Sequence, residues 1–319
     1  MKYVGIQTQQ RRNNLRSVVL LFFFPCLVIM LTFLFSFIFL FWESMEGERY
    51  GLLSNSFNMT KSLIPIILTG VIIWFIVAYF SNIRIINKAT SAKPLERREN
   101  KRVYNLVENL CMTQGMRMPN IQVIEDYSLN AYASGINKKT YTITLSRGII
   151  ENLEDEELEA VIAHELSHIK NRDVRLLIVS IVFVGVFSMI AEMAIKMVRY
   201  SSFSGGKNNK SNGIILLIAF AVAILGYLFA SLMRFAISRN REYIADAGAA
   251  EMTRNPLALA GALRKISNNP AIEAVKRNDI AQLFIEHPLE KKKSLFNGLS
   301  SLFATHPPID KRIEVLEGF

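Results

Sequence analysis

The segment AVIAHELSHIKNRDVRLLIVSIVFVGVF, from Ala160 to Phe187, places two histidines and a glutamate directly before a long apolar run. The first half reads H-E-x-x-H. Positions four apart on an α-helix lie on one face, so His164 and His168 can bind the same metal ion. Glu165 can reach a water bound to that metal. A chance match on a surface helix is the alternative, but the chain has only four histidines, and two of them have this spacing.

Apolar residues make up 51% of the 319 residues, and they gather in four uncharged runs. These runs are Ser17–Trp42, Ser62–Ile83, Leu176–Ala191 and Ser211–Met233. A membrane-spanning helix needs about 20 apolar residues, so the third run is marginal and the others are long enough. The first run exceeds the apolar core of a signal peptide, and no small-residue cleavage site follows it. We therefore expect a retained membrane anchor.

The net charge of +10 fits a membrane protein better than a nucleic-acid-binding one, because no recognition motif accompanies it. Lys and Arg are concentrated in cytoplasmic loops. Their distribution predicts that the N-terminus and the chain after the second run are cytoplasmic, with the loop Glu43–Lys61 outside. The loop between the third and fourth runs is also basic, which conflicts with full crossing. Either the first two helices set the topology, or the later pair enters the membrane only partway.

A catalytic zinc has three protein ligands and one open position, so a third ligand must come from elsewhere. The segment SRNREYIAD, Ser238–Asp246, carries Glu242 and Asp246 four positions apart on one helix face. One carboxylate can bind the metal while the other orients a ligand histidine. The alternative is a solvated helix in which Arg239 or Arg241 pairs with these acids.

The remaining patterns predict an α+β protein that is mainly helical. Apolar residues recur at helical spacing in Arg97–Leu110, and Glu154–Glu157 place negative charge at the start of the helix that carries H-E-x-x-H. Asn255-Pro256 is typical of a helix start. Short strands are expected at Ile121–Ile124, Asn130–Gly135 and Thr140–Ser146, the last with strictly alternating polarity.

Several motifs occur in an order that resembles the M48 peptidases, and in particular the bacterial membrane proteases of that family. They are H-E-L-S-H with Asn171-Arg172-Asp173, R-E-Y-x-A-D at Arg241–Asp246, N-A-Y-A-S-G at Asn130–Gly135, and Thr305-His306-Pro307-Pro308 with Arg312. The resemblance covers nearly the whole chain. It implies an integral membrane protein with four hydrophobic helices and a cytoplasmic, gluzincin-like zinc protease domain.

The resemblance also implies roles for individual residues. One Zn²⁺ would be bound by His164, His168 and Glu242, with Glu165 as the base that deprotonates the attacking water. Asp246 would orient His164 by accepting a hydrogen bond from the ring nitrogen that does not bind the metal.

Two further assignments have structural alternatives. His306, supported by Arg312, is the candidate donor to the oxyanion, unless His306-Pro307-Pro308 only begins the last helix. Asn130, Ala131 and Tyr132 would bind an extended substrate peptide along an edge strand, unless this strand is purely structural.

These assignments predict four parts: a membrane hairpin in residues 1–83, the first part of the catalytic domain in 84–173, a second membrane hairpin in 174–233 and the second catalytic part in 234–319. His168 lies eight residues before Leu176, and Glu242 nine after Met233. The site would therefore lie on the order of 12–14 Å along each helix from the membrane run.

The expected function is a zinc metalloendopeptidase of the bacterial inner membrane. It would cleave misfolded or damaged membrane proteins at the cytoplasmic face as part of a stress response. One alternative is the prenyl-protein processing branch of the same family, which generally has more spans. A non-catalytic membrane scaffold that holds a metal is the other, although such a scaffold would not need Glu165.

Overall fold

The computed structural model describes residues 6–44, 51–178, 241–272, 283–286 and 307–319, and six isolated positions at 196, 220–221 and 224–226. The chain divides into two compact units. Among the longer described segments, the first unit contains residues 6–17, 80–178, 241–272, 283–286 and 307–319, and the second contains 18–44 and 51–79. The four-part division expected from the sequence remains a prediction.

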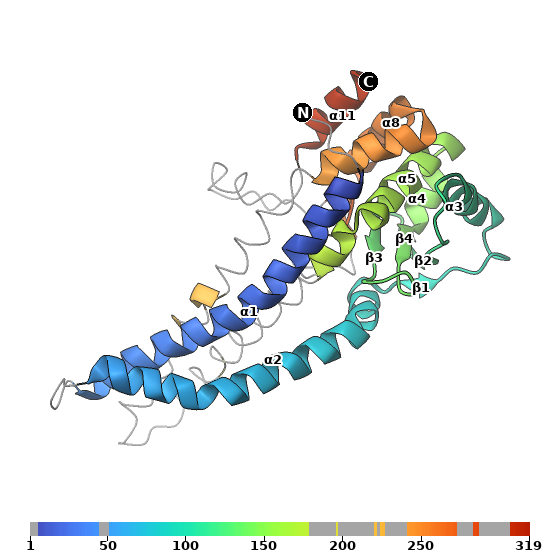
Figure 1. Ribbon diagram of the computed structural model, residues 1–319. Coiled ribbons are helices and arrows are strands. Elements are labelled where there is room, and N and C mark those ends of the chain that lie inside the picture. Colours follow the sequence, from blue (N-terminus) through green and yellow to red (C-terminus); the bar gives the residue numbers. More distant parts are fainter. Residues whose placement is uncertain are drawn as a thin grey trace. The chain divides into compact units, whose positions relative to one another are not determined.

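The first unit is built on a four-stranded sheet in the order β1-β2-β4-β3 (Figure 1). The strands are β1 (Lys93–Pro94), β2 (Asn120–Ile124), β3 (Ala131–Ser134) and β4 (Thr142–Ser146). β2 and β4 are parallel, whereas the β1–β2 and β3–β4 pairs are antiparallel. The three strands predicted from the sequence are present. The short β1 was not predicted, because two residues, one of them proline, carry no alternating pattern.

Further helices of the first unit pack against this sheet or against one another. They are α3 (Lys101–Thr113), α4 (Arg147–Asn152), α5 (Asp155–Asn171), α8 (Pro256–Asn268) and α11 (Ile309–Glu317). Asn100 caps α3 by accepting a hydrogen bond from the amide of Val103, so this helix begins later than Arg97. α5 packs against α8 and β3, and α8 packs against α11. The sheet and α8 thus hold the H-E-x-x-H helix from different directions.

α5 ends abruptly. Arg172 adopts a left-handed backbone conformation with φ 61°, and helical residues 173–178 follow it. The sequence had suggested that this helix continues unbroken into the third apolar run. That expectation was wrong, because the left-handed residue redirects the chain directly after the metal-binding motif. Most of the third and fourth apolar runs lies outside the described residues.

Two long helices account for the first two apolar runs. α1 (Ile6–Glu43) and α2 (Leu52–Thr90) contain stretches long and apolar enough to cross a membrane, Arg11–Phe41 and Leu52–Ser81. In the second unit the rings of Phe24 and Phe75 meet edge to face, with centroids 5.8 Å apart. α2 already begins at Leu52, so most of the predicted loop Glu43–Lys61 is helical.

Both helices expose many large apolar side chains. Phe22 on α1 is 72% exposed and Ile66 on α2 is 68% exposed. Exposed apolar surface on this scale marks a contact with lipid or with another protein.

Candidate metal centre

Among the described residues, every buried acidic, basic or histidine side chain belongs to one cluster. The members are His164, Glu165, His168, Asp173, Arg241, Glu242, Asp246 and Arg312. Isolated buried charges are costly, so a cluster of this kind implies that its members compensate one another. Four carboxylates against two guanidinium groups leave two negative charges when both imidazoles are neutral. A divalent cation would neutralise them.

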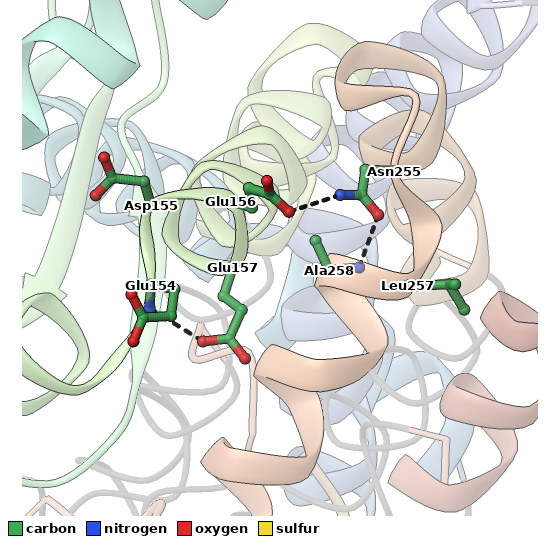
Figure 2. A pocket seen from close by; sticks show the side chains of 7 residues that line it. All are labelled: Glu154, Asp155, Glu156, Glu157, Asn255, Leu257 and Ala258. Atoms are coloured by element: carbon green, nitrogen blue, oxygen red, sulfur yellow. Dashed lines mark hydrogen bonds between the residues drawn. The ribbon is translucent and has the colours of Figure 1, made fainter.

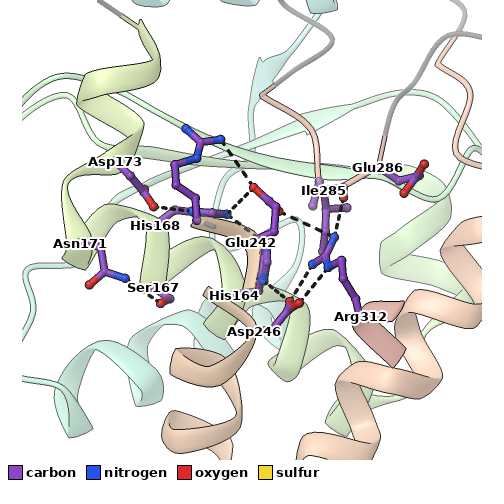
Figure 3. A network of polar contacts seen from close by, with 12 residues as sticks. His164, Ser167, His168, Asn171, Asp173, Glu242, Asp246, Ile285, Glu286 and Arg312 are labelled. Carbon is purple, nitrogen blue, oxygen red and sulfur yellow. Dashed lines mark hydrogen bonds and ion pairs between the residues drawn. The ribbon is translucent and has the colours of Figure 1, made fainter. Parts of the chain in front are cut away.

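The three predicted ligands come together at the centre of this cluster (Figure 3). His164 and His168 lie one turn apart on α5, and Glu242 lies on the helical segment 241–253. The two Nε2 atoms are 3.1 Å apart. The carboxylate oxygens of Glu242 lie 3.6 Å from Nε2 of His164 and 3.8 Å from Nε2 of His168.

These separations fit a zinc ion. In a tetrahedral site with Zn–N bonds of about 2.0–2.1 Å, neighbouring ligand atoms are roughly 3.3 Å apart. The observed spacings of 3.1, 3.6 and 3.8 Å lie close to that value. Two imidazoles and one carboxylate are also a typical donor set for a catalytic zinc site.

Each imidazole lies with its second ring nitrogen, Nδ1, beside a carboxylate. Oδ1 of Asp246 lies 3.0 Å from Nδ1 of His164. Nδ1 of His168 is hydrogen-bonded to Oδ2 of Asp173 at 3.0 Å. When Nδ1 carries the proton toward a carboxylate, the lone pair of Nε2 is free to bind a metal. Both imidazole rings are therefore oriented so that Nε2 can bind a metal ion.

The charges around His164 shift the pKa values of the group. Burial alone would lower the pKa of His164, but contacts with Asp246 and Glu242 outweigh it and raise that pKa to about 9. Burial would raise the pKa of Asp246, whereas the charge and hydrogen bonds of Arg312 lower it below its usual value. Asp246 is therefore ionised throughout the neutral range.

Arg312 lies behind Asp246. Its Nε and Nη2 atoms donate to the two oxygens of Asp246 at 2.8 and 2.7 Å, and Nη1 donates to the carbonyl of Ile285 at 3.0 Å. The side chain is fully buried. Asp246 thus pairs with Arg312, whereas Arg241 lies beside Glu242 and Arg239 lies outside the described residues. These bonds give Arg312 a positioning role at Asp246, and its predicted support of His306 remains a prediction.

Two members of the cluster were not predicted from the sequence. Asp173 belongs to the N-R-D motif, but its contact with His168 depends on the left-handed turn at Arg172. Arg241 was part of the R-E-Y-x-A-D motif without a role of its own, and only the alternative interpretation made it a solvated partner of the acids. It is 5% exposed, and its Nη2 atom lies 3.5 Å from Oε1 of Glu242. The adjacency of Arg241 to Glu242 was visible in the sequence, although burial was not.

Glu165, the predicted general base, is buried beside the candidate ligands. It is 1% exposed, and its carboxylate oxygens make no hydrogen bond with any residue that the structure describes. Burial raises its pKa. Together with His168, Asp173 and Glu242, Glu165 lines a cavity of about 10 Å³. That volume is about the room needed by one water molecule.

The predicted substrate-binding residues lie at β3 and contact the chain itself. Asn130 donates hydrogen bonds to the carbonyls of Pro270 and Glu286, at 2.8 and 2.9 Å. The hydroxyl of Tyr132 is bonded to that of Thr90 at 2.9 Å, and the carbonyl of Ala131 accepts from Ile285. Their role toward substrate remains a prediction. His306 lies outside the described residues.

Close packing fixes Glu242 relative to the histidines. Gly248, on the same helical segment as Glu242, faces Ser167 on α5. A Cβ atom at Gly248 would lie 2.2 Å from the hydroxyl oxygen of Ser167 and 3.1 Å from its Cβ. The backbone of segment 241–253 therefore approaches α5 as closely as glycine allows, and this approach brings the third ligand within reach.

A larger surface hollow lies elsewhere, between the start of α5 and the start of α8 (Figure 2). Asp155 begins α5, nine residues before His164, or roughly 13 Å along the helix. The polar groups of the hollow form the N-terminal caps of these two helices. Glu154 and Glu157 form a capping box, while Asn255 caps α8 and donates to Glu156 at 3.2 Å. This hollow is separate from the candidate metal centre.

Comparison with known proteins agrees with this geometry. Residues 97–319 match the model of peptidase family M48. A Protease HtpX homolog from Bacteroides fragilis strain YCH46 is 65% identical over 322 residues, covering 100% of both chains. A Protease HtpX homolog from Listeria monocytogenes strain HCC23 is 37% identical, over 86% of this chain and 91% of the relative.

Another Protease HtpX homolog, from Lactobacillus helveticus, is 38% identical over 80% of this chain and 85% of the relative. The crystal structure of S. mikatae Ste24p covers 80% of this chain and 58% of that chain, with 22% identity and a TM-score of 0.47. The chain therefore belongs to peptidase family M48, as a membrane-bound zinc metalloprotease.

Proposed function

We propose that the chain cleaves misfolded or damaged membrane proteins within their cytoplasmic segments, as part of quality control in the bacterial inner membrane. The observation that carries the proposal is the buried centre of His164, His168 and Glu242, with the carboxylate of Glu165 beside it. A scaffold that only holds a metal would not need Glu165, whose raised pKa suits proton transfer.

In this proposal each residue has a defined task. His164, His168 and Glu242 hold zinc, while Asp246 and Asp173 fix the two imidazoles. Zinc supplies Lewis acidity, which polarises a carbonyl oxygen and makes water a better nucleophile near neutral pH. Glu165 takes the proton from the attacking water and later gives it to the nitrogen of the leaving amine.

The oxyanion that forms at the substrate carbonyl needs a further donor. His306 is the proposed donor, on the strength of the T-H-P-P motif. Arg312 supports the site indirectly through Asp246. Substrate binds in an extended conformation along β3, where main-chain hydrogen bonds recognise any sequence.

The membrane substrates follow from the position of the site in the sequence. Helical residues 173–178 follow the left-handed turn at Arg172 and include the first residues of the third apolar run. Segments of other proteins that emerge from the bilayer would reach such a site before soluble chains do. The excess of Lys and Arg after the second run supports a cytoplasmic site.

The test uses the zinc-loaded full chain in sealed vesicles with a single-span substrate. The substrate carries an unfolded segment either on the face of the catalytic unit or on the opposite face. We expect cleavage only in the first arrangement, and none with Glu165→Gln in either. Equal cleavage in both arrangements, or cleavage of soluble proteins alone, would contradict the proposed substrate class.

A further inference from the structure

The outer edge of β3 is occupied by four residues from a distant part of the chain. Tyr132 forms an antiparallel bridge with Phe284, and the amide of Ile285 donates to the carbonyl of Ala131 at 2.9 Å. β4 pairs with the other edge of β3. Within the described chain, segment Leu283–Glu286 therefore takes the hydrogen-bonding groups that an added peptide strand would use.

Side chains reinforce this backbone pairing. The rings of Tyr132 and Phe284 lie with centroids 4.7 Å apart, and both side chains are fully buried. Asn130 holds the end of the segment: it donates to the carbonyl of Glu286 at 2.9 Å and accepts from the amide of Glu286 at 3.4 Å. Arg312 binds the carbonyl of Ile285. The segment thus has backbone and side-chain partners on both sides.

The same segment also closes the metal centre. Leu283, Phe284 and Ile285 line the small cavity together with Glu165 and two of the candidate ligands, His168 and Glu242. With about 10 Å³ available, this cavity accommodates about one water molecule and no peptide. A substrate that pairs with β3 beside Glu165 must first displace the segment.

We propose that Leu283–Glu286 is a built-in competitor for the substrate site. The inference rests on the proposed binding of substrate along β3. It also defines a substrate class: extended segments that place an aromatic side chain opposite Tyr132, as Phe284 does. Strand pairing is independent of sequence, so the aromatic contact is the selective part. Unfolded apolar segments of membrane proteins are of this kind, whereas polar segments would leave the competitor in place.

A reversible cross-link gives the first test. The bond from Ile285 to Ala131 flanks the bridge, so Tyr132 and Phe284 form a non-hydrogen-bonded pair with Cα atoms about 4.5 Å apart. Such a pair allows a disulfide. Tyr132→Cys and Phe284→Cys are combined in a chain whose two native cysteines, Cys26 and Cys111, are replaced by alanine.

Oxidation of this double variant should reduce casein cleavage at least tenfold while zinc content stays constant, and a reductant should restore the rate. Each single cysteine variant, treated identically, serves as the control and should not respond to oxidant. Full activity of the cross-linked chain would overturn the proposal.

The second test measures binding without cleavage. A labelled peptide with the sequence of residues 282–289, QLFIEHPL, is titrated into zinc-loaded Glu165→Gln and into Glu165→Gln with Phe284→Ser. Because the competitor is weakened in the double variant, we expect the peptide to bind at least tenfold more tightly there. Phe319→Ser, at a phenylalanine that is 70% exposed, is the matched control and should change nothing.

The peptide result does not depend on proteolysis, so the two proposals can fail separately. If the peptide binds the Phe284→Ser variant and its parent with equal affinity, Leu283–Glu286 does not compete with substrate. The proposal would also be contradicted if a peptide with serine in place of its phenylalanine bound as tightly as the original peptide, because the aromatic contact would then not be selective. Tighter peptide binding together with equal cleavage of the two membrane substrate arrangements would instead contradict only the proposed function.

Discussion

The two histidines that are proposed to bind zinc are oriented by carboxylates of different origin. Asp246, which holds His164, comes from another helical segment and is itself fixed by both oxygens to Arg312. Asp173, which holds His168, lies five residues further along the same stretch of chain. The geometry of the metal centre therefore depends on two separate chains of contacts, which can be tested one at a time.

Replacing Asp246 should weaken zinc binding. In Asp246→Asn the charge beside His164 is lost and Arg312 keeps no carboxylate partner at that position. We expect zinc affinity to fall about 10–100-fold in a chelator competition. Asp310→Asn, an exposed acid on α11, is the matched control. An affinity within about twofold of wild type would show that Asp246 does not support His164.

Asp173 should act on His168 in the same way. Asp173→Ala removes the acceptor of the 3.0 Å hydrogen bond, and we expect zinc affinity to fall about tenfold or more. In Asp173→Asn an amide oxygen can still accept that bond, so the loss should be smaller. Equal losses in both variants would point to a general structural role. Glu151→Gln, at an exposed position on α4, should leave zinc affinity unchanged.

The sequence predicted Asp246 but not Asp173, and the reason is geometric. Glu242 and Asp246 are four apart, so helical periodicity alone places them on one face. Residue Asp173 is five after His168, which in a continuous helix points roughly 140° away from it. Only the left-handed conformation of Arg172 brings the two together, and an arginine gives no signal for that conformation.

At the level of whole elements, the third ligand depends on how closely two helical segments approach. Gly248 lets segment 241–253 lie against Ser167 of α5. The register of this contact places Glu242 opposite the two histidines. A change that separates the segments should therefore affect chemistry as well as stability, although neither residue binds the metal.

Gly248→Ala should lower proteolysis by about 10–100-fold, because shifts of about 1 Å in a catalytic site have effects of that size. The new Cβ would meet the hydroxyl of Ser167. Adding Ser167→Ala removes that oxygen and should restore part of the activity. Initial rates on casein and zinc content of the three variants test this. If Ser167→Ala gives no recovery, direct crowding at Ser167 is not the cause.

Element prediction succeeded where periodicity was sufficient. The strand and helix starts at Asn120, Asp155 and Pro256 follow patterns or caps that the sequence displays. The alternation in β4 is typical of a strand with one solvent-facing side, yet all five of its residues are buried. Thr142 and Thr144 lie inside the fold despite their hydroxyls. Alternating polarity cannot reveal that the protein covers both faces of a strand.

At the scale of the whole molecule, α1 and α2 expose apolar stretches that suit a membrane, while the buried charges collect in the other unit. The sequence located both long helices and the three candidate metal ligands that the structure brings together. It could not locate the pairing of Leu283–Glu286 with β3, since four residues without a pattern give no indication of a distant partner. Long-range strand pairing is decided by the folded core, which local sequence does not encode.

Membrane orientation gives a prediction at this scale. The distribution of Lys and Arg places the start of α2 outside and segment 241–253 inside. In a chain without native cysteines, Ser54→Cys should react with a membrane-impermeant maleimide added to intact cells, whereas Glu251→Cys should react only after lysis. Both parent side chains are exposed, which makes them a matched pair. Labelling of Glu251→Cys in intact cells would reverse the orientation.

The central claim is that one buried centre binds zinc and uses Glu165 as its base. Purified wild type and Glu165→Gln should be compared for zinc content and for casein cleavage in the same preparation. The ligands remain in the variant while the base is lost, so zinc content should stay equal and cleavage should fall more than tenfold, about 1.4 kcal/mol of barrier. Cleavage by Glu165→Gln above a tenth of the wild-type rate would contradict the account.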